Sequence, residues 1–297
     1  MQIAVMGAGA IGCYFGAMLA RAGHAVTLIG RASHVEAVKQ SGLLLEARGS
    51  SIRVPLQAST DAAGVSGADV VLFCVKSSDT ESAGRAIAPH LKKSAIVLCL
   101  QNGVDNAERL QATISQIAVP AVVYVATEMA GPGHVKHHGR GELIIGASPG
   151  SVDIADAFSR AAIPTAVSSH VIDELWIKLI TNCAYNALSA VAQLPYGRLI
   201  KAGGVADLIA AVVGECARVA AALGVTIPDD VIKRVLALPE SMPDQYSSTA
   251  QDLARNKSTE IEYLNGYVVR KGAELSIPVP ANLALLVMVR LLEEKIR

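Results

Sequence analysis

Hydrophobic and polar positions follow two different patterns along this chain, and the change falls near residue 168. Up to that point, short apolar runs of strand length alternate with stretches of helical periodicity. The apolar runs predict buried parallel strands at residues 70–75, 95–100 and 121–126. The stretches between them predict helices at residues 80–90 and 106–117. Two hairpins are also predicted, over residues 43–46 and 52–55 with a turn at 48–50, and over 135–138 and 142–146 with a turn at 139–141. This alternation favours a Rossmann-type, doubly wound α/β sheet.

From residue 171 onward the strand patterns disappear, and long segments with a period near 3.6 residues follow one another. They predict helices over residues 171–191, 205–223, 229–238, 249–271 and 281–295, separated by glycine and proline breaks. We therefore expect two domains, an α/β domain over residues 1–168 and an all-helical domain over residues 169–297. In such a pair, the ligand is expected at the carboxyl ends of the strands, in a cleft between the domains.

Composition narrows the functional class. The chain has 297 residues, of which 52% are hydrophobic and 18% charged, and this is enough for two well-buried cores. Because 26 basic residues balance 26 acidic ones, neither a nucleic-acid surface nor a polybasic membrane anchor is predicted. The most apolar stretches, residues 208–213 and 283–289, are too short to span a bilayer. The first strand follows the N-terminus without a basic leader, so we expect a cytoplasmic protein with no membrane partner.

The cysteines and histidines do not predict a metal site. The five cysteines lie far apart, mostly within apolar runs, which is typical of buried reduced thiols. The histidines cluster only at His134, His137 and His138, where no cysteine or acidic ligand set accompanies them.

A glycine-rich turn at the start of the chain indicates a dinucleotide site. The segment Gly7-Ala-Gly9-Ala-Ile-Gly12 follows an apolar strand and opens an apolar helix. In this spacing, Gly7 permits the tight turn, Gly9 lets the backbone approach a pyrophosphate, and Gly12 lets the helix pack on the strand. The free N–H groups at the helix start then face the phosphate charge.

The residue at the end of the second strand bears on which dinucleotide binds. NAD-binding sheets usually carry Asp or Glu here to hold the ribose 2′-hydroxyl, whereas this chain has Gly30-Arg31. A cation at this place suits a 2′-phosphate, so NADP is the expected cofactor. A solvated loop arginine is the alternative interpretation.

Two polar clusters follow the next predicted strands. Lys76 and several hydroxyl groups come directly after one strand, and the two amides Gln101 and Asn102 come after the next. Both clusters lie where such a sheet contacts its cofactor. Ser, Asp and Asn are also ordinary helix-capping and turn residues, and this second interpretation stays open for each cluster.

The most specific pattern lies in the helical part. Lys178, Asn182 and Asn186 recur every four positions, so they share one stripe of a helix whose other faces are mostly apolar. A lysine and two amides in such surroundings require partners or a ligand. The pKa of a lysine shifts readily when it is buried, which suits this side chain to proton donation. A solvated polar helix face is the alternative.

A last cluster begins at Ser247-Ser248 and continues to Glu260. Ser248 and Gln251 fit a capping box, so Ser248 is interpreted either as a helix start or as a functional hydroxyl. Glu260 is then expected about three turns further along the same helix. The alternative for Glu260 is a surface glutamate near Lys257.

Taken together, these clusters resemble the ketopantoate reductase (2-dehydropantoate 2-reductase) family over essentially the whole chain. The matching segments, in order, are GAGAIG at Gly7, VKSSDT at Val75, LQNGV at Leu100, PGHVKHHGRG at Pro132, WIKLITNCAYN at Trp176 and TEIEYLNG at Thr259. The resemblance implies a Rossmann domain followed by a helical domain like that of 6-phosphogluconate dehydrogenase. It also implies NADPH-dependent reduction of 2-dehydropantoate to pantoate, a step toward pantothenate and coenzyme A, by a monomer or homodimer.

The resemblance also implies roles for individual residues. Lys178 matches the catalytic lysine that donates a proton to the ketone, and Glu260 matches the acid near the reacting oxygen. Asn182, Asn186 and Ser248 match substrate-binding positions, and Asn102 matches a residue that lines both the nicotinamide ribose and the substrate. The cofactor positions implied are Gly7, Gly9, Ala10, Ile11 and Gly12 in the turn, Arg31 and Lys76 at the 2′-phosphate, and Asn102.

Other functions remain open at this point. Thr249 stands where the family commonly has methionine, so another branched 2-oxo acid is an alternative substrate. A β-hydroxyacid dehydrogenase of the 6-phosphogluconate type also uses Lys-x-x-x-Asn, but it has a glycine-rich lead before the lysine, which is absent here. An NADP-binding sensor without turnover is the third alternative, and the presence of both Lys178 and Glu260 speaks against it.

Overall fold

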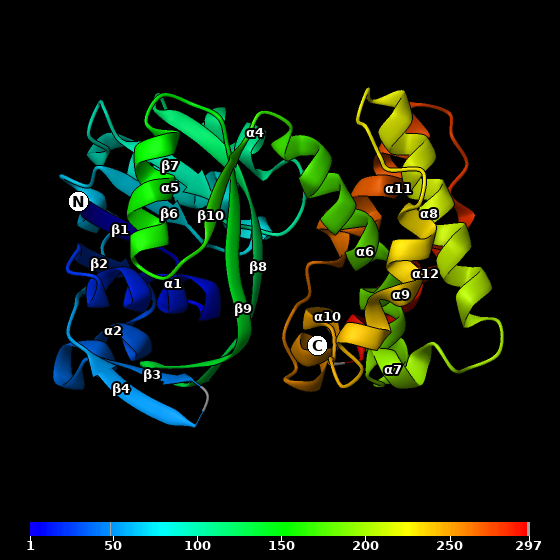
Figure 1. Cartoon of the computed structure of the whole chain (residues 1–297), viewed down its shortest axis with the longest axis horizontal. Coiled ribbons are helices and arrows are strands. Elements are labelled where there is room, and N and C mark those ends of the chain that lie inside the picture. The colour runs from blue at the N-terminus through cyan, green and yellow to red at the C-terminus, as the bar shows by residue number, and fades with distance from the viewer. Residues whose placement is uncertain (48, 296–297) are drawn as a thin grey trace. The chain divides into compact units, whose positions relative to one another are not determined.

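The chain folds into two compact units in a computed structural model that describes residues 1–47 and 49–295. The N-terminal unit spans Met1–Val171, and the helical unit begins at Ile172. The first unit contains every strand in the described residues, and the second contains only helices (Figure 1). The predicted fold class, a Rossmann-type sheet followed by an all-helical part, is confirmed.

The N-terminal unit is built on a mixed sheet with strand order β4-β3-β9-β8-β7-β6-β1-β2-β5. Its strands are β1 (Gln2–Met6), β2 (Ala25–Ile29), β3 (Leu43–Ala47), β4 (Ser50–Val54), β5 (Gln57–Ser59), β6 (Val70–Phe73), β7 (Ile96–Cys99), β8 (Ile117–Gly131), β9 (His134–Gly146) and β10 (Thr165–Ser168). From β5 to the start of β8, the strands pair in parallel. The chain order reverses between β1 and β6, and a sheet of this kind binds ligands outside the carboxyl ends at that point.

Helices cover both faces of the sheet because the strand residues alternate. Ile3 and Val5 face one core, which is completed by α1 (Ala10–Arg21), α2 (Ala32–Ser41) and α5 (Ser151–Arg160). The residue between them, Ala4, faces a second core with α3 (Thr80–Ile87) and α4 (Asn106–Gln111). Short 3₁₀ turns complete the unit at η1 (Ala62–Val65), η2 (Ser77–Asp79) and η3 (Ala88–His90). Burial on both faces explains why β6 is a continuous apolar run.

One predicted hairpin is confirmed and the other is wrong. Strands β3 and β4 pair antiparallel as expected, and Arg48 of the predicted turn lies outside the described residues. The hairpin predicted around 139–141 does not exist, because β9 runs through these residues and pairs antiparallel with β8. Gly139 and Gly141 have φ angles of 154° and 148°, and the register shifts beside them. Gly141 is therefore the extra residue of a bulge, and Gly139 lies directly beside a second bulge, so both glycines lie within a strand and not in a turn between two strands.

Strand β8 also differs from its prediction. Residues 117–120 pair in parallel with β7, whereas residues 121–131 pair antiparallel with β9. Residues 121–126 are therefore part of a strand, as predicted, but not a parallel one. The predicted helix over 106–117 ends at Gln111, and residue 117 already begins β8.

The helical unit packs around α6 (Val171–Ala192), which starts at the last residue of the N-terminal unit. It continues with α7 (Tyr196–Leu199), α8 (Val205–Ala222), α9 (Val231–Ser241), α10 (Ser248–Ala254), η4 (Ile261–Tyr263), α11 (Asn265–Glu274) and α12 (Pro280–Glu294). Tyr185 on α6 is fully buried, and its hydroxyl donates to Val235 O on α9 at 3.0 Å. Four of the five predicted helices are found near their expected bounds.

The fifth helix, predicted over residues 249–271, is broken into α10, η4 and α11. Asn256 has a φ of 52°, a left-handed conformation that ends α10. Glu260 therefore lies at the start of η4 and not three turns along one helix from Ser248. Among the described residues, no helix is both long and apolar enough to cross a membrane.

Candidate active site

The glycine turn after β1 is held tightly between two strand ends. The N–H groups of Gly7 and Ala8 both donate to Ile29 O at the end of β2, at 2.9 Å. Gly7 has a φ of 108°, and a Cβ there would lie 2.7 Å from the backbone of Cys74 and Val75. Only glycine fits this conformation and this approach. A Cβ on Gly12 would overlap the carbonyl oxygen of Gly7, so this glycine permits helix α1 to start directly on the turn.

Gly9, unlike Gly7 and Gly12, is not crowded by neighbouring atoms. A Cβ built on it would meet no protein atom within 4 Å, so the space above this residue is open. Gly9 is also the N-cap of α1, and no side chain caps the N–H groups of the first turn, where Ala10 and Ile11 lie. Open space in front of uncapped N–H groups at a helix N-terminus fits a pyrophosphate. The turn therefore has the form that a dinucleotide requires.

Arg31 lies at the end of β2, beside this turn in the sheet. It is the N-cap of α2, and its side chain is exposed. The preceding Gly30 is enforced by packing, because a Cβ there would lie 2.5 Å from the Cβ of Ala8. The position where an acidic residue would hold a ribose 2′-hydroxyl is thus occupied by a glycine and an exposed cation.

Lys76 and Asn102 lie at the same edge of the sheet. Lys76 is the N-cap of η2, three residues beyond β6, and Asn102 lies three residues beyond β7. Because β1, β2, β6 and β7 are parallel neighbours, their carboxyl ends bring the glycine turn, Arg31, Lys76 and Asn102 to one edge. Two side chains of α4 that the sequence did not single out, Asn106 and Arg109, form hydrogen bonds with these two loops: Asn106 with the backbone of Asn102, and Arg109 with the backbone of Ser77, next to Lys76. In the sequence, these two residues appear only as polar residues at the start of a predicted helix, which does not indicate a role at the site.

The stripe on α6 is found as predicted. Helix α6 includes Lys178, Asn182 and Asn186 at intervals of four residues. Lys178 and Asn182 are partly buried, and Asn186 is only 3% exposed. Two nearby residues of α6 are almost completely buried, namely Trp176 and Leu179. The stripe is thus a polar line on a helix that is otherwise largely packed in the core.

Ser248 is brought to the end of this stripe. The Nδ2 of Asn186 lies 3.5 Å from Ser248 Oγ. The neighbouring Ser247 is the N-cap of α10, where its Oγ accepts from Ala250 N at 3.0 Å and donates to Asn186 O at 3.1 Å. The interpretation of Ser248 as the capping residue of a capping box is therefore wrong: the N-cap is Ser247, and Ala250 at the third helical position has no side chain that could complete such a box. Because Ser247 carries the cap, the exposed hydroxyl of Ser248 is left at the first helical position beside Asn186.

Glu260 is partly buried at the start of η4, and the segment that follows it is hydrogen-bonded to α6. Five residues on, Asn265 is fully buried and its Nδ2 donates to Cys183 O on α6 at 3.2 Å. Cys183 lies between Asn182 and Asn186 on the helix. The segments of Ser248 and Glu260 are therefore anchored to the same two turns of α6, although they come from separate elements.

Neither buried thiols nor a metal cluster provides a second reactive centre in the part of the chain that the structure describes. Burial raises the pKa of the Cys13 and Cys99 thiols to about 12, so neither is a thiolate nucleophile near neutral pH. Within residues 1–47 and 49–295, no group of three or more His, Cys, Asp or Glu side chains is arranged for a metal ion.

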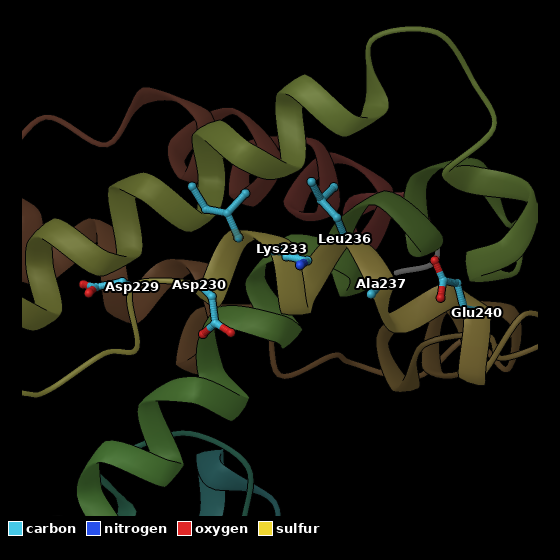
Figure 2. Close-up of a pocket in the computed structure, with 7 residues that line it drawn as sticks. Asp229, Asp230, Lys233, Leu236, Ala237 and Glu240 are labelled. Atoms are coloured by element: carbon cyan, nitrogen blue, oxygen red, sulfur yellow. The ribbon is translucent and has the colours of Figure 1, made fainter.

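Figure 2 shows a pocket of about 550 Å³ along α9, lined by Asp229, Asp230, Ile232, Lys233, Leu236, Ala237 and Glu240. It contains none of the residues predicted for the site. It is wide open, and Arg234 on the same helix already pairs with Asp230 at 2.7 Å. This surface depression on α9 therefore shares no lining residue with either polar arrangement described above.

Comparison with known proteins agrees with this geometry. The sequence model described as ketopantoate reductase PanE/ApbA matches residues 3–150, and the model of the C-terminal part of the same family matches residues 170–293. The chain belongs to the PanE/ApbA ketopantoate reductase family. The two matches together cover both the glycine turn and the α6 stripe.

Individual relatives support the assignment over the full length. The chain is 35% identical to a 2-dehydropantoate 2-reductase of Halobacterium salinarum, with 98% of each chain covered. A crystal structure of a PanE/ApbA family ketopantoate reductase from Ralstonia eutropha is 55% identical, has a TM-score of 0.97, and covers 100% of this chain and 99% of that one. A ternary structure of D-mandelate dehydrogenase with NADH and anilino(oxo)acetate is 27% identical, has a TM-score of 0.93, and covers 100% and 99%.

Proposed function

We propose that this chain is an NADPH-dependent reductase of 2-dehydropantoate that forms pantoate. The observation that carries the proposal is the α6 stripe of Lys178, Asn182 and Asn186 with Ser248 docked at its end, in a chain 55% identical to a family ketopantoate reductase over its whole length. The uncapped, open glycine turn supports the cofactor part of the proposal. The activity serves a route toward pantothenate and coenzyme A.

In this proposal, a bound nicotinamide cofactor would supply the hydride that reduces the C2 carbonyl carbon of the oxo acid. Lys178 donates a proton to the carbonyl oxygen, where negative charge develops, and Glu260 orients the substrate at the same oxygen. Asn182 and Asn186 bind the substrate's hydroxyl group, and Ser248 binds its carboxylate. Asn102 lines both the nicotinamide ribose and the substrate and so fixes their relative orientation.

For the cofactor, we propose NADPH over NADH. Gly7, Gly9, Ala10, Ile11 and Gly12 hold the pyrophosphate, and Arg31 and Lys76 hold the 2′-phosphate. The support is chemical: two cations stand at the strand ends, and the end of β2 offers no carboxylate for a 2′-hydroxyl. The D-mandelate dehydrogenase relative contains NADH, so the preference between the two cofactors is a point to be measured on this chain.

A similar structure, that of D-mandelate dehydrogenase, and one residue of this chain, Thr249, point to a second class of substrate. D-mandelate dehydrogenase has nearly the same fold, and Thr249 stands directly after the proposed carboxylate ligand. Thr249 is only 2% exposed, so it acts on specificity through the position of Ser248 and not by touching substrate. We therefore keep another branched 2-oxo acid as the alternative substrate. A non-catalytic NADP-binding sensor is the alternative from a different class.

We further propose that the enzyme works in the cytoplasm, as a monomer or a homodimer, on a small-molecule substrate. The five cysteines are all free, as is usual for proteins of a reducing compartment. Light scattering on the purified protein distinguishes the two oligomeric states.

The test is a substrate panel with the purified chain. 2-Dehydropantoate, phenylglyoxylate and unbranched 2-oxo acids are each supplied with NADPH and with NADH, and turnover is followed at the nicotinamide absorbance band. We expect the highest kcat/KM for 2-dehydropantoate with NADPH, with pantoate as the product. A higher kcat/KM for another oxo acid selects the alternative substrate. NADPH binding by calorimetry without turnover of any panel member contradicts the enzyme and supports the sensor.

A further inference from the structure

A buried polar network lies beneath the edge of the sheet where Lys76 and Asn102 stand. It is formed by side chains of η2, α3 and α4, and its centre is Asn106, the first residue of α4. Asn106 is 3% exposed, and Ser77 and Thr80 are completely buried. Buried polar groups in this number are maintained only when nearly all of them are hydrogen-bonded.

Asn106 connects the two loops directly. Its Nδ2 donates to the backbone oxygen of Asn102 at 2.7 Å and to Ser77 Oγ at 3.3 Å. Ser77 Oγ in turn donates to the same Asn102 oxygen at 3.1 Å. The residue next to Lys76 and the backbone of Asn102 are thus joined through one amide and one hydroxyl.

The side-chain oxygen of Asn106 makes the remaining contacts of the network. Its Oδ1 lies 3.0 Å from Thr80 Oγ1 and 3.3 Å from an Nη1 of Arg109. Arg109 also donates through Nη2 to Ser77 O at 2.9 Å, and it forms a bidentate ion pair with Glu81 at 2.7 Å. The Arg109 guanidinium holds the pKa of the Glu81 carboxyl below its usual value. Both the carbonyl oxygen and the hydroxyl of Ser77 are therefore held by side chains of α4.

We propose that Asn106 is a positioning residue that sets Lys76 and Asn102 in the relative place that cofactor binding requires. The inference rests on the proposed roles of Lys76 and Asn102. Its side chain is too buried to touch a ligand, and it acts on the backbone of one contact residue and on the neighbour of the other. Preorganisation of this kind lowers the cost of ordering two loops on binding.

Gln116 provides a matched control in the same unit. It is 9% exposed, and its Nε2 donates to Leu91 O at 3.4 Å and to Lys92 O at 3.3 Å. It thus joins two chain segments through a buried amide, as Asn106 does. However, these segments precede β7 and β8, at the amino ends of the strands and away from Lys76 and Asn102.

Three variants separate positioning from folding. Asn106→Ala removes the whole bridge, and we expect the NADPH Kd to rise roughly tenfold, as for the loss of one or two buried hydrogen bonds. Asn106→Asp keeps the acceptor for Thr80 and Arg109 and adds a favourable charge in the first turn of α4, but it loses both donors to the loops. Its NADPH Kd is expected to rise at least as much as in Asn106→Ala, because a carboxylate oxygen would face the Asn102 carbonyl oxygen in place of the Nδ2 donor. Ser77→Ala, the milder change, is expected to raise the Kd about threefold.

The measurements are NADPH titration by calorimetry, Tm, and kcat and KM for 2-dehydropantoate. Gln116→Ala is expected to lower Tm like Asn106→Ala but to leave the NADPH Kd within about twofold of the parent. If the Kd follows Tm across all four variants, or if Asn106→Asp binds NADPH like the parent, the positioning role is wrong. A parent chain that binds NADPH without turnover contradicts the proposed function, while the Kd comparison still tests Asn106. A parent that binds no dinucleotide overturns both.

Discussion

The two polar regions of this chain are built in different ways. At the glycine turn the decisive feature is backbone: a φ of 108° at Gly7, uncapped N–H groups at the start of α1, and space where Gly9 lacks a side chain. On α6 the decisive feature is side chains, because a regular helix carries Lys178, Asn182 and Asn186 at four-residue intervals. We therefore expect the glycine turn to be impaired by substitutions that add a side chain, and the α6 stripe by substitutions that remove a functional group.

In the proposed function, this difference separates cofactor binding from proton transfer. A backbone cradle recognises a phosphate group that does not change during the reaction, so it contributes equally to ground state and transition state. A lysine that donates a proton acts only as charge develops on the substrate oxygen. Variants of the first region should therefore change cofactor affinity, and variants of the second should change kcat.

The largest expected effect is that of Lys178→Ala. Removing the proposed proton donor should lower kcat for 2-dehydropantoate by roughly 10²- to 10⁴-fold, the usual range for a general acid. The NADPH Kd should stay within about twofold of the parent, because the proposed contacts with the pyrophosphate and the 2′-phosphate all come from residues of the N-terminal unit. Lys233→Ala, an exposed lysine on α9, is the matched control and should leave kcat unchanged. Full turnover by Lys178→Ala would remove the catalytic assignment.

Gly9→Ala tests the backbone region by adding a single methyl group. The new Cβ meets no protein atom within 4 Å, so the fold should tolerate it with little change in Tm. The methyl group occupies the space proposed for the pyrophosphate, and the NADPH Kd should rise roughly 10- to 100-fold through lost phosphate hydrogen bonds. Gly203→Ala adds a methyl group to equally open space in the helical unit and should change neither quantity. Unchanged NADPH affinity in Gly9→Ala would show that the pyrophosphate lies elsewhere.

Arg31→Ala sharpens the cofactor side. Losing one charge-assisted contact to a 2′-phosphate should raise the NADPH Kd about tenfold and leave the NADH Kd unchanged. Arg21→Ala, an exposed arginine in the last turn of α1, serves as the control. The check is the ratio of kcat/KM for the two cofactors in each variant. Equal ratios in the parent and in Arg31→Ala would exclude Arg31 from the 2′-phosphate site.

The smallest expected effect concerns the segment that holds Glu260. Glu262 in η4 accepts from Arg290 on α12, at 2.8 Å from Nη2 to Oε2, and this contact lowers the pKa of Glu262 below its ordinary value of 4.5. A lowered pKa in the folded state adds stability above pH 4.5, and that stability is lost as the pH falls through the folded-state pKa. Glu262→Gln should therefore lower Tm by no more than about 2–4 °C near neutral pH.

Below pH 4.5 the Tm difference between Glu262→Gln and the parent should shrink. Calorimetric scans of both proteins over a pH series measure it. A difference that stays constant into strong acid would assign the effect to packing and not to the ion pair.

The backbone region could be predicted from the sequence almost completely. Glycine spacing after an apolar strand has few structural solutions, so Gly7, Gly9 and Gly12 were found where expected. The network of Asn106 and Arg109 could not be predicted, because its contacts join residues of two loops that only the strand pairing brings together. Polar residues at a helix start look the same in sequence whether they cap the helix or join loops.

The sequence misplaced elements where glycine or a single left-handed residue decides. Gly139 and Gly141 suggested a turn, but β9 continues through both residues, with Gly141 in a bulge and Gly139 paired with Ala126 of β8. The periodicity over 249–271 suggested one helix, and the left-handed Asn256 ends it early. Ser247 and Ser248 are equally good caps by composition, and only packing against α6 decides between them. Tertiary context determined each of these outcomes.

The central claim is that the glycine turn binds the cofactor while the α6 stripe performs the proton transfer. The most direct measurement compares Gly9→Ala and Lys178→Ala in the same two assays, the NADPH Kd by calorimetry and the single-turnover rate of NADPH oxidation at saturating cofactor and 2-dehydropantoate. We predict a weakened Kd with a near-parental rate for Gly9→Ala, and a parental Kd with a rate at least 10²-fold lower for Lys178→Ala. If the two variants lose affinity and rate in parallel, this division of roles is contradicted.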